Sequence, residues 1–442
     1  MNYQLKKYPK YKPSGIEWIG EIPEHWEVKK VKHIAKTIAG GTPSTTNREY
    51  WNGDIPWLNS GKVQNNIINL ESVDKYITKR GLEESSTKMI KSNSVLVALT
   101  GATCGNIGFL TFSSTANQSI VAIENNNEVN PKFLFYFLLS QREQILIEKS
   151  GGAQSGINEG DVKNIILSLP PLPEQTAIAN FLDDKTAKID SLIEKKKKLI
   201  ELYKEERTAV INHYVLGQHL IDNSQLTIDN GQLTIDNYQL PKHWEVKKLK
   251  YVAKVNNENL SENEDDDLLI NYIDISSVDS DGNIVSTTEY LYPKAPSRAR
   301  RKLKSGDTIL STVRTYLKAI AFIDKAYDNL ICSTGFAVIS PSEVFIPKFL
   351  FFNLRSNIVI EKIMANSKGV SYPAIDSEEI KFLYVWYPPK EEQQQIVEHI
   401  ESETKLLDDK IARAEKEIEL LQEYKTALIN EVVTGKIKVI DN

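Results

Sequence analysis

The stretch that decides the fold is Pro23-Glu-His-Trp-Glu-Val-Lys-Lys-Val-Lys-His-Ile-Ala-Lys36. It returns almost unchanged, at an offset of 218, as Pro241-Lys-His-Trp-Glu-Val-Lys-Lys-Leu-Lys-Tyr-Val-Ala-Lys254. The same offset relates Thr208-Ala-Val-Ile-Asn212 to Thr426-Ala-Leu-Ile-Asn430. A constant offset over so long a stretch indicates that a whole unit was duplicated. We therefore expect two similar copies in tandem with approximate two-fold symmetry, suited to a partner that is itself two-sided.

The composition is that of a globular chain without overall basic character. The 442 residues are 41% hydrophobic, and 54 Lys and Arg stand against 59 Asp and Glu, for a net charge of −5. The length by itself predicts about three domains. Nucleic-acid-binding proteins are usually basic overall, so any such function has to depend on local patches.

The sequence carries no signal for a membrane or for secretion. The richest apolar run, from Phe133 to Leu139, is far shorter than the roughly 18 residues of a membrane span. The N-terminus has no apolar signal-peptide core, so we expect a cytoplasmic protein. Cys104 and Cys332 stand one in each copy, far from any spacing that predicts zinc or a disulfide framework.

Each copy divides into a mixed segment and a long helix. The mixed segments contain short strand-like runs such as Ser94–Leu99 and Asp307–Ser311, and each contains a helix that starts at a proline, Pro131 or Pro347. Proline pairs then precede some forty residues without proline or glycine. We predict these domains: 1–172, first α/β domain; 173–217, first long helix; 218–239, linker; 240–389, second α/β domain; 390–436, second long helix.

The long segments, from about 174 to 213 and from 392 to 431, show the periodicity of a coiled coil. Alternating steps of three and four residues connect Ile400, Thr404, Leu407, Ile411, Ala414, Ile418, Leu421, Lys425 and Leu428. Subtracting 218 gives Leu182, Thr186, Ile189, Ile193, Lys196, Ile200, Tyr203, Arg207 and Val210. Helices of roughly 60 Å with one apolar stripe need a partner. The nearest partner is the other copy, so we expect an antiparallel helix pair.

The linker contains a short perfect repeat, Gln225-Leu-Thr-Ile-Asp-Asn followed by Gln232-Leu-Thr-Ile-Asp-Asn. Asn230-Gly231 fits a β-hairpin with a type I′ turn, and a flexible, recently multiplied linker is the alternative.

Signatures of catalysis are absent. Gly151-Gly-Ala-Gln-Ser-Gly156 has the glycine spacing of a phosphate-binding loop, but Ile157-Asn158 replaces the required Lys and Ser or Thr. Asp376, Glu379 and Lys381 stand too close together for a metal-dependent nuclease site. His25 and His243 precede a tryptophan in both copies, which favours a packing role. We expect no catalytic residue, no metal site and no cofactor.

With these motifs in view, the chain resembles the specificity subunit of a type I restriction-modification system over essentially its full length. The resemblance rests on Lys12-Pro-Ser-Gly-Ile-Glu-Trp-Ile-Gly-Glu-Ile-Pro-Glu-His-Trp26, Gly40-Gly-Thr-Pro-Ser44, Tyr50-Trp51, Ile55-Pro-Trp57 and Pro170-Pro-Leu-Pro-Glu-Gln175. It implies two target-recognition domains that each read half of an interrupted sequence in double-stranded DNA. It also implies paired helices that act as a ruler and bind two copies of an adenine methyltransferase (modification) subunit, with restriction or translocase subunits as further partners.

The second copy departs from the first where recognition is expected. Asn257-Glu-Asn-Leu-Ser261 stands in place of Gly40-Gly-Thr-Pro-Ser44, and an acidic run from Glu262 to Asp267 follows it. The two domains are therefore expected to read different half-sites.

We assign candidate DNA contacts by residue type. Arg and Lys suit phosphates, whereas amides, hydroxyls and Arg suit base edges. Phosphate candidates are Arg48, Lys62, Lys79, Arg80 and Lys88 in the first copy, and Arg298, Arg300, Arg301, Lys302 and Lys304 in the second. Base-edge candidates are Thr42, Ser44, Asn59, Ser60, Asn106 and Gln118 in the first, and Ser276, Arg314, Tyr316, Lys318 and Tyr372 in the second. A solvated loop or an internal hydrogen bond remains the alternative role for each.

Two other functions stay open from the sequence. One is a scaffold whose coiled coil assembles partners without sequence-specific DNA binding, which the acidic balance favours. The other is a self-sufficient methyltransferase or nuclease, which the missing motifs disfavour. A neighbouring reading frame for an adenine methyltransferase would argue against the latter.

Overall fold

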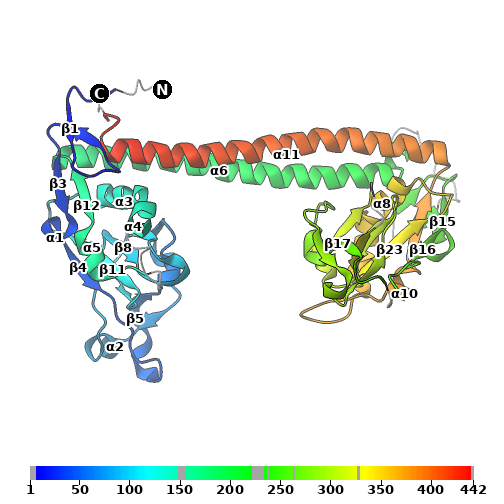
Figure 1. Ribbon diagram of the computed structural model, residues 1–442, viewed down its shortest axis with the longest axis horizontal. Coiled ribbons are helices and arrows are strands. Elements are labelled where there is room, and N and C mark those ends of the chain that lie inside the picture. Colours follow the sequence, from blue (N-terminus) through cyan, green and yellow to red (C-terminus); the bar gives the residue numbers. More distant parts are fainter. Residues whose placement is uncertain are drawn as a thin grey trace. The chain divides into compact units, whose positions relative to one another are not determined.

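The chain folds as two α/β domains joined by two long antiparallel helices, as the repeat predicts. The computed structural model describes residues 6–147, 156–221, 233–235, 238–261, 264–325 and 329–439. It divides into two compact units, Met1–Lys196 with Lys416–Asn442 (unit 1) and Lys197–Glu415 (unit 2). Each unit contains one α/β domain and about half of each long helix (Figure 1).

The two long helices begin directly after the proline pairs. Helix α6 spans Leu172–Val215 and helix α11 spans Lys390–Val433, so each extends two residues beyond both predicted ends. Both are followed by a glycine with positive φ, Gly217 at +66° and Gly435 at +77°. A left-handed glycine in this position ends a helix without the steric cost of a Cβ atom.

Within each unit the two helices run antiparallel along the predicted apolar seam. In unit 1, Lys425 Nζ lies 2.6 Å from Asp190 Oδ1. In unit 2, Arg207 Nε lies 3.1 Å from Asp408 Oδ1, and the Tyr214 hydroxyl donates to Glu403 at 2.9 Å. Because the offset of 218 converts Asp190 into Asp408 and Arg207 into Lys425, the first two ion pairs are equivalent.

Two charged residues in the seam of α6 are stabilised by ion pairs. Lys196 and Arg207 interrupt the apolar stripe of α6 and are both only partly exposed. Lys196 forms an ion pair with Glu417, and Arg207 pairs with Asp408. Each cation in the seam therefore has an acidic partner on α11 of the same unit.

Within the described residues, the domain of unit 1 contains twelve strands and five short helices. Its strands are β1 (Tyr11–Pro13), β2 (Glu21–Pro23), β3 (Glu27–Lys30), β4 (Ala35–Ala39), β5 (Trp51–Leu58), β6 (Asn66–Ile68), β7 (Tyr76–Ile77), β8 (Ser94–Ala98), β9 (Ile107–Leu110), β10 (Thr115–Ala116), β11 (Ile120–Asn125) and β12 (Ile166–Leu169). Its helices are α1 (Val31–Ile34), α2 (Lys79–Glu83), α3 (Pro131–Ser140), α4 (Arg142–Ile147) and α5 (Glu159–Asn164).

A five-stranded sheet in the order β4-β11-β8-β9-β6 forms the centre of this domain, beside a three-stranded sheet β10-β5-β7. Alternate residues of β8 enter two different cores. Val95 and Val97 pack toward Phe133 and Phe137 of α3, whereas Leu96 packs on the opposite face. The phenylalanines of α3 are thus core residues, as their helical spacing predicts.

The domain of unit 2 follows a similar plan. Its strands are β13 (Leu233–Ile235), β14 (Tyr238–Leu240), β15 (Glu245–Lys248), β16 (Ala253–Val255), β17 (Leu269–Ile273), β18 (Thr288–Leu291), β19 (Ala299–Lys302), β20 (Thr308–Ser311), β21 (Ile320–Phe322), β22 (Leu330–Ser333), β23 (Phe336–Pro341) and β24 (Tyr384–Tyr387). Its short helices are α7 (Gln218–Ile221), α8 (Pro347–Leu354), α9 (Asn357–Asn366) and α10 (Ser377–Ile380).

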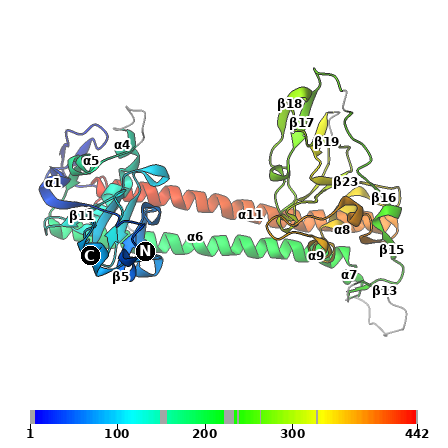
Figure 2. The same cartoon turned by 90° about the horizontal axis from the view of Figure 1, so that it is seen from below.

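Two four-stranded sheets, β16-β23-β20-β21 and β18-β17-β22-β19, build this second domain. The side chains of Phe349 and Leu350 of α8 cover one face of the first sheet. Its other face packs against the second sheet through residues such as Val338 and Cys332. Figure 2 shows β17, β18 and β19 on the side of β23 that faces away from α8.

The start of each long helix is fixed to its domain by a buried glutamine. Gln175 donates to Pro170 O at 2.8 Å and accepts from Asn130 N at 2.7 Å. Gln393 repeats the arrangement, donating to Pro388 O at 2.9 Å and accepting from Ile346 N at 2.8 Å. Both side chains are at most 1% exposed, so each amide replaces water for buried backbone groups.

The repeated His-Trp pair has the packing role that the sequence predicts. His25 Nε2 lies 2.8 Å from Glu174 Oε2, and Trp26 Nε1 donates to the same carboxylate at 3.2 Å. The equivalent contacts of Glu392, with His243 and Trp244, are 2.7 and 2.9 Å. One carboxylate at the start of each helix therefore holds both aromatic side chains.

The end of each long helix packs against the domain of the other sequence copy. In unit 2, the end of α6 meets the second domain, where Trp386 Nε1 donates to Val215 O at 2.8 Å. In unit 1, the end of α11 meets the first domain, where Gly435 lies against Pro23 and Trp26. Each structural unit is thus completed by a helix end from the other sequence copy.

The predicted hairpin turn at Asn230-Gly231 lies outside the described residues. Strands β13 and β14 do pair in antiparallel fashion, with Leu233 opposite Leu240. The glycine-rich stretch Gly151–Ser155 also lies outside the described residues.

Candidate nucleic-acid interface

In unit 1, several loops come together at one edge of the two main sheets. Strand β5 is parallel to β10, and β8 is antiparallel to β11, with Ala98 opposite Ile120. The loops that follow β5, β8 and β10 therefore leave the sheets at the same edge. A hydrogen bond of 2.8 Å from Asn117 N to Leu58 O joins two of them.

The loop Gly40–Ser44 reaches this edge and is held by two tryptophans. Trp57 Nε1 donates to Gly41 O at 3.1 Å, and Trp51 Nε1 donates to Ser44 O at 3.0 Å. A Cβ atom on Gly40 would lie 2.1 Å from Asn117 O, so only glycine allows this close approach. The motifs that carry the sequence resemblance therefore have a structural role: the Gly40–Ser44 motif forms a loop, and the tryptophans of the two motifs that follow hold it at this edge.

From the polar side chains on these converging loops of unit 1 we select six and call them recognition edge 1: Thr42, Ser44, Asn59, Ser60, Thr100 and Gln118. The Thr42 hydroxyl and the Gln118 amide, two predicted contacts that are distant in the sequence, are hydrogen bonded at 2.5 Å. Thr100 Oγ1 donates to Ser119 Oγ at 2.9 Å. Ser44, Thr100 and Gln118 are exposed.

Asn106 does not join this edge. Its side chain is buried, and it donates to Val63 O at 3.0 Å while accepting from Arg142 Nε at 3.0 Å. The expectation that it faces a base is therefore not met, because the amide is used to connect loops internally. Asn106 was chosen for its residue type, and the long-range contact to Val63 is not visible in the sequence.

The basic candidates of unit 1 are scattered. Arg48 is exposed in a 3₁₀ turn, whereas Lys62 forms a 3.0 Å ion pair with Asp74. The hydrogen bond from Lys62 holds the pKa of Asp74 below its usual value. Arg80 is engaged by Glu84 at 2.9 Å and by Glu49. Lys79 pairs with Glu83 at 3.6 Å, and Lys88 is exposed.

In unit 2, the predicted contacts converge more completely. Strand β17 is parallel to β22, β20 is antiparallel to β23, and Ser311 lies opposite Phe336. The loops after β17, β20 and β22 consequently share one edge. The segment that leads to α10 joins them, because Ile375 N donates to Thr312 O at 2.8 Å.

We call the exposed candidates on these loops recognition edge 2: Ser276, Arg298, Arg314, Tyr316, Lys318 and Tyr372. The guanidinium of Arg314 lies 4.9 Å from the ring centroid of Tyr372. The Tyr372 side chain is 66% exposed and that of Tyr316 is 49% exposed. The edge therefore offers two aromatic rings and three cations to solvent.

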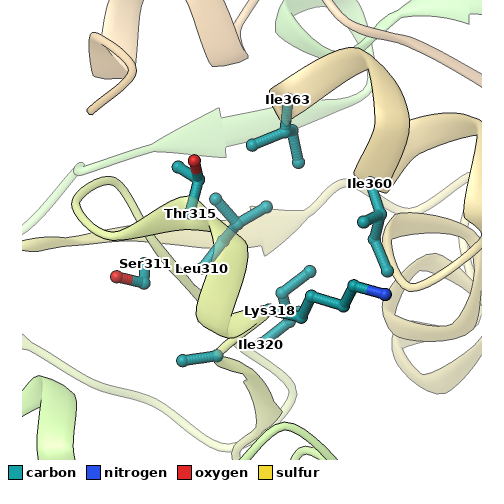
Figure 3. A pocket seen from close by; sticks show the side chains of 8 residues that line it. Leu310, Ser311, Thr315, Lys318, Ile320, Ile360 and Ile363 are labelled. Carbon is teal, nitrogen blue, oxygen red and sulfur yellow. The ribbon is translucent and has the colours of Figure 1, made fainter. Parts of the chain in front are cut away.

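The loop after β20 lies over a hollow that is too small to bind a ligand. Its wall consists of Leu310, Ser311, Thr315, Lys318, Ala319, Ile320, Ile360 and Ile363 (Figure 3). The hollow has room for about one water molecule, so it cannot admit a base. The aliphatic part of Lys318 passes Ile320 and its ammonium group points toward Ile360.

The basic cluster on and beside β19 consists of one residue at edge 2 and four residues that lie away from it. Arg298 lies at edge 2, where its carbonyl accepts from Thr334 N at 2.8 Å. The remaining members run away from that edge and are used internally. Arg300 donates to the Tyr292 hydroxyl at 2.8 Å, and Arg301 is only partly exposed.

Acidic residues of the second copy neutralise the far part of this cluster. Lys302 pairs with Glu264 at 3.4 Å, and Lys304 pairs with Glu258. The hydrogen bond to Glu258 raises the pKa of Lys304, and a backbone hydrogen bond from Ser261 lowers the pKa of Glu264. Arg300, Lys302 and Lys304 can contact phosphates only if these internal partners are exchanged.

Sequence reasoning missed three exposed residues at these edges: Thr100, Leu317 and Val370. The Leu317 side chain is 40% exposed and Val370 is fully exposed. A usable signal was their position directly after buried strands or beside other candidates, because loops at strand ends commonly carry function.

Other kinds of site are not found. Within the described ranges, no group of three or more His, Cys, Asp or Glu side chains is arranged to hold a metal ion. Among the same residues, no helix is long and apolar enough to cross a membrane.

The family model described as "Type I restriction modification DNA specificity domain" matches the chain twice, over residues 23–202 and 241–420. This chain belongs to that family. It is a specificity subunit, the non-catalytic DNA-recognition component that acts with methyltransferase and restriction subunits. The two matches begin at positions 23 and 241, in agreement with the offset of the internal repeat.

Two relatives illustrate the match. The type I restriction enzyme MjaIX specificity subunit of Methanocaldococcus jannaschii is 25% identical over 431 residues, covering 95% of each chain. The EcoR124I/EcoR124II specificity subunit of Escherichia coli is 26% identical over 211 residues, or 46% of this specificity subunit and 49% of the relative.

A solved structure shares the fold. It comes from work on "complex assembly and conformational transition of the type I R-M system" and aligns with a TM-score of 0.63 at 16% identity. The alignment covers 93% of this specificity subunit and 98% of that chain.

Proposed function

We propose that this specificity subunit reads a two-part sequence in double-stranded DNA, one part with recognition edge 1 and the other with recognition edge 2. Direct readout of B-DNA takes place mainly in the major groove, where each base pair presents a distinct pattern of donors, acceptors and methyl groups. Amide, hydroxyl and guanidinium groups on loops at a sheet edge are suited to this pattern.

One observation carries the proposal. The two edges lie at corresponding strand ends, after β5 and β8 in one unit and after β17 and β20 in the other, but they bear different side chains. Edge 1 is polar and nearly uncharged, whereas edge 2 carries Arg298, Arg314 and Lys318. A repeated scaffold with divergent loops is what a reader of two unlike half-sites requires.

The long helices, together with the linker that joins the two copies, are proposed to set the gap between the half-sites. Their ion pairs Asp190–Lys425 and Arg207–Asp408 fix one antiparallel register along the apolar seam. A fixed register gives a fixed separation, because each helical residue contributes the same rise along the axis, about 1.5 Å.

We further propose that two copies of the modification subunit bind, one for each repeat. The junctions built on Gln175 and Gln393 are equivalent in their hydrogen bonds, so a partner that recognises one should recognise the other. Two methyltransferases would then modify one adenine on each side of the target.

The experiment is to reconstitute the chain with its modification subunit, to incubate the complex with genomic DNA, and to map the methylated positions by sequencing. The expected result is a motif of two specified blocks separated by a constant number of unspecified bases. Gln118→Ala should relax one block and Tyr372→Ala the other. Methylation at a single uninterrupted motif, or without any motif, would refute the proposal.

A further inference from the structure

The same loop joins two neighbouring antiparallel strands in both units, β8 to β9 in unit 1 and β20 to β21 in unit 2. Equivalent backbone hydrogen bonds define it: Ala98 N to Asn106 O (2.9 Å) and Cys104 N to Gly101 O (3.0 Å) in unit 1, and Ser311 N to Ala319 O (2.9 Å) and Leu317 N to Arg314 O (2.9 Å) in unit 2. Each loop also encloses a single 3₁₀ turn. These shared hydrogen bonds, with equal spacing between them, place Gly101 at the position of Arg314 and Gly105 at that of Lys318.

Two positions in this loop require the left-handed backbone conformation. In unit 1 both are glycines, Gly101 with φ of +72° and Gly105 with φ of +76°. In unit 2 the same positions are Arg314 with φ of +51° and Lys318 with φ of +53°. Glycine adopts this conformation freely, whereas a side chain with a Cβ atom is strained in it.

Contacts inside unit 2 do not account for this strain. Arg314 and Lys318 are exposed, and neither forms an ion pair in the described part of the chain. Arg314 stacks on Tyr372, which is itself exposed. Lys318 lines a hollow with room for about one water molecule, so its side chain is not needed to fill a cavity (Figure 3). Unit 1 demonstrates that glycine builds the same loop without them.

We infer that Arg314 is the specificity-determining residue of the second half-site and that Lys318 anchors the DNA backbone beside it, both kept in strained positions because they bind DNA. The inference rests on the proposed function and deepens it. Arg314, held in place by the ring of Tyr372, has the planar pair of donors that matches the O6 and N7 acceptors of guanine. Lys318, at the other end of the 3₁₀ turn, supplies a point charge for a neighbouring phosphate.

Strained residues at exposed, unpaired positions are commonly found at functional sites, where the surrounding structure holds them. The backbone strain also separates the two possible roles by experiment. If Arg314 and Lys318 served stability, glycine would weaken the fold. If they serve recognition, glycine leaves the fold intact or stabilises it while DNA binding is lost.

The test uses Arg314→Gly and Lys318→Gly in the full chain, reconstituted with the modification subunit. We expect the unfolding temperature to stay the same or rise for both variants. Arg314→Gly should weaken binding to the target duplex at least tenfold and relax one position of a single half-site. Lys318→Gly should weaken binding to all duplexes alike and reduce its dependence on salt.

Three controls make the result specific. Arg314→Asn keeps a residue that tolerates the left-handed conformation but removes the charge, and it should lose recognition like the glycine variant. Arg314→Lys should keep part of the affinity and lose the guanine preference. Lys254→Ala removes an exposed lysine of β16, at the opposite end of β23, and should leave the motif unchanged.

The inference is overturned if the glycine variants bind the target as tightly as the parent, or if they unfold at clearly lower temperature. Its failure is distinguishable from failure of the proposed function. A parent complex that yields no two-part motif refutes the function, whereas a two-part motif that survives Arg314→Gly refutes only this assignment.

Discussion

The two units agree closely where each domain meets a long helix and differ where their loops leave the sheets. At the helix starts, Glu174 and Glu392 hold the same pair of aromatic side chains, and Gln175 and Gln393 satisfy the same backbone groups. At the recognition edges, Gly101 of one unit corresponds to Arg314 of the other. Duplication has kept the contacts that fold each unit, while the contacts that we assign to DNA have diverged.

The largest expected loss of stability comes from variants at the helix starts, where the two units agree. Replacing Gln175 or Gln393 by Leu leaves buried backbone groups without a hydrogen-bond partner, at a cost of about 2–4 kcal/mol of unfolding free energy. The two losses should be similar, because the bonding patterns are equivalent. Urea unfolding of each variant measures this.

Gln394→Leu is the matched control for these variants. Gln394 is exposed, and among the described residues its side chain bonds only to Glu398, so its replacement should change the unfolding free energy by less than about 0.5 kcal/mol. A large effect in one unit with none in the other would break the equivalence of the two junctions.

A smaller effect tests the symmetry of the seam. The equivalent ion pairs Asp190–Lys425 and Arg207–Asp408 each have one half-exposed carboxylate, so we expect a coupling energy of about 0.5–1 kcal/mol in each. Double-mutant cycles with alanine give this quantity from four unfolding curves per pair. Coupling in only one of the pairs would show that the helix register is specified unequally.

The short helix α7, which follows the end of α6 in unit 2, differs from the segment after α11 in a way that depends on pH. Burial lowers the pKa of His219, whose ring lies near those of Tyr214 and His213, with Glu392 and His399 also acting on it. The sequence counterpart of His219 is Ile437, a buried residue in unit 1. One helix end is therefore titratable and the other is apolar.

Because the pKa of His219 is lower in the folded than in the unfolded chain, the stability that neutral His219 contributes is fully present above the ordinary histidine value of 6.5 and is lost as the pH falls below it, through the lower pKa of the folded state. We expect unit 2 to become less stable between pH 7 and pH 5, and His219→Ile to reduce that dependence. Thermal unfolding across this pH range measures it, and His33→Ala, at an exposed position of unit 1, is the control. An unchanged slope in His219→Ile would contradict the assignment.

The smallest effect on stability is expected from an insertion into the linker that joins the two sequence copies. Inserting one further Gln-Leu-Thr-Ile-Asp-Asn unit after Asn237 should leave the unfolding free energy unchanged while the complex tolerates a different gap between its half-sites. Sequencing of methylated DNA shows the gap directly. Methylation at sites of unchanged spacing would mean that the helix seam alone sets the gap.

Much of the fold was predictable from local pattern. The proline pairs and the glycines at 217 and 435 bounded α6 and α11 to within two residues, because both residue types restrict the backbone directly. The seam positions followed from their spacing. The site was harder to predict: the candidates Thr42 and Gln118 lie together in the structure, whereas the candidate Asn106 is buried.

The basic cluster shows why the site was harder to predict than the fold. Charge density along the chain singled out Arg298 to Lys304, yet an extended segment of this length spans about 20 Å, so its residues reach different surroundings. Only Arg298 ends at the recognition edge, while Glu258 and Glu264 engage the lysines. Such pairings join distant parts of the chain, and the spacing of residues does not encode them.

The sequence alone determined that the protein is a duplicated pair of α/β domains with two long helices, because repeat offset, helix boundaries and seam are properties of local residue order. Only the tertiary structure decided that the end of each helix completes the unit of the other copy, as Val215 does with Trp386. It also decided that Arg314 and Lys318 occupy positions where unit 1 has glycine. Both facts depend on contacts and backbone angles that arise only when distant segments pack together.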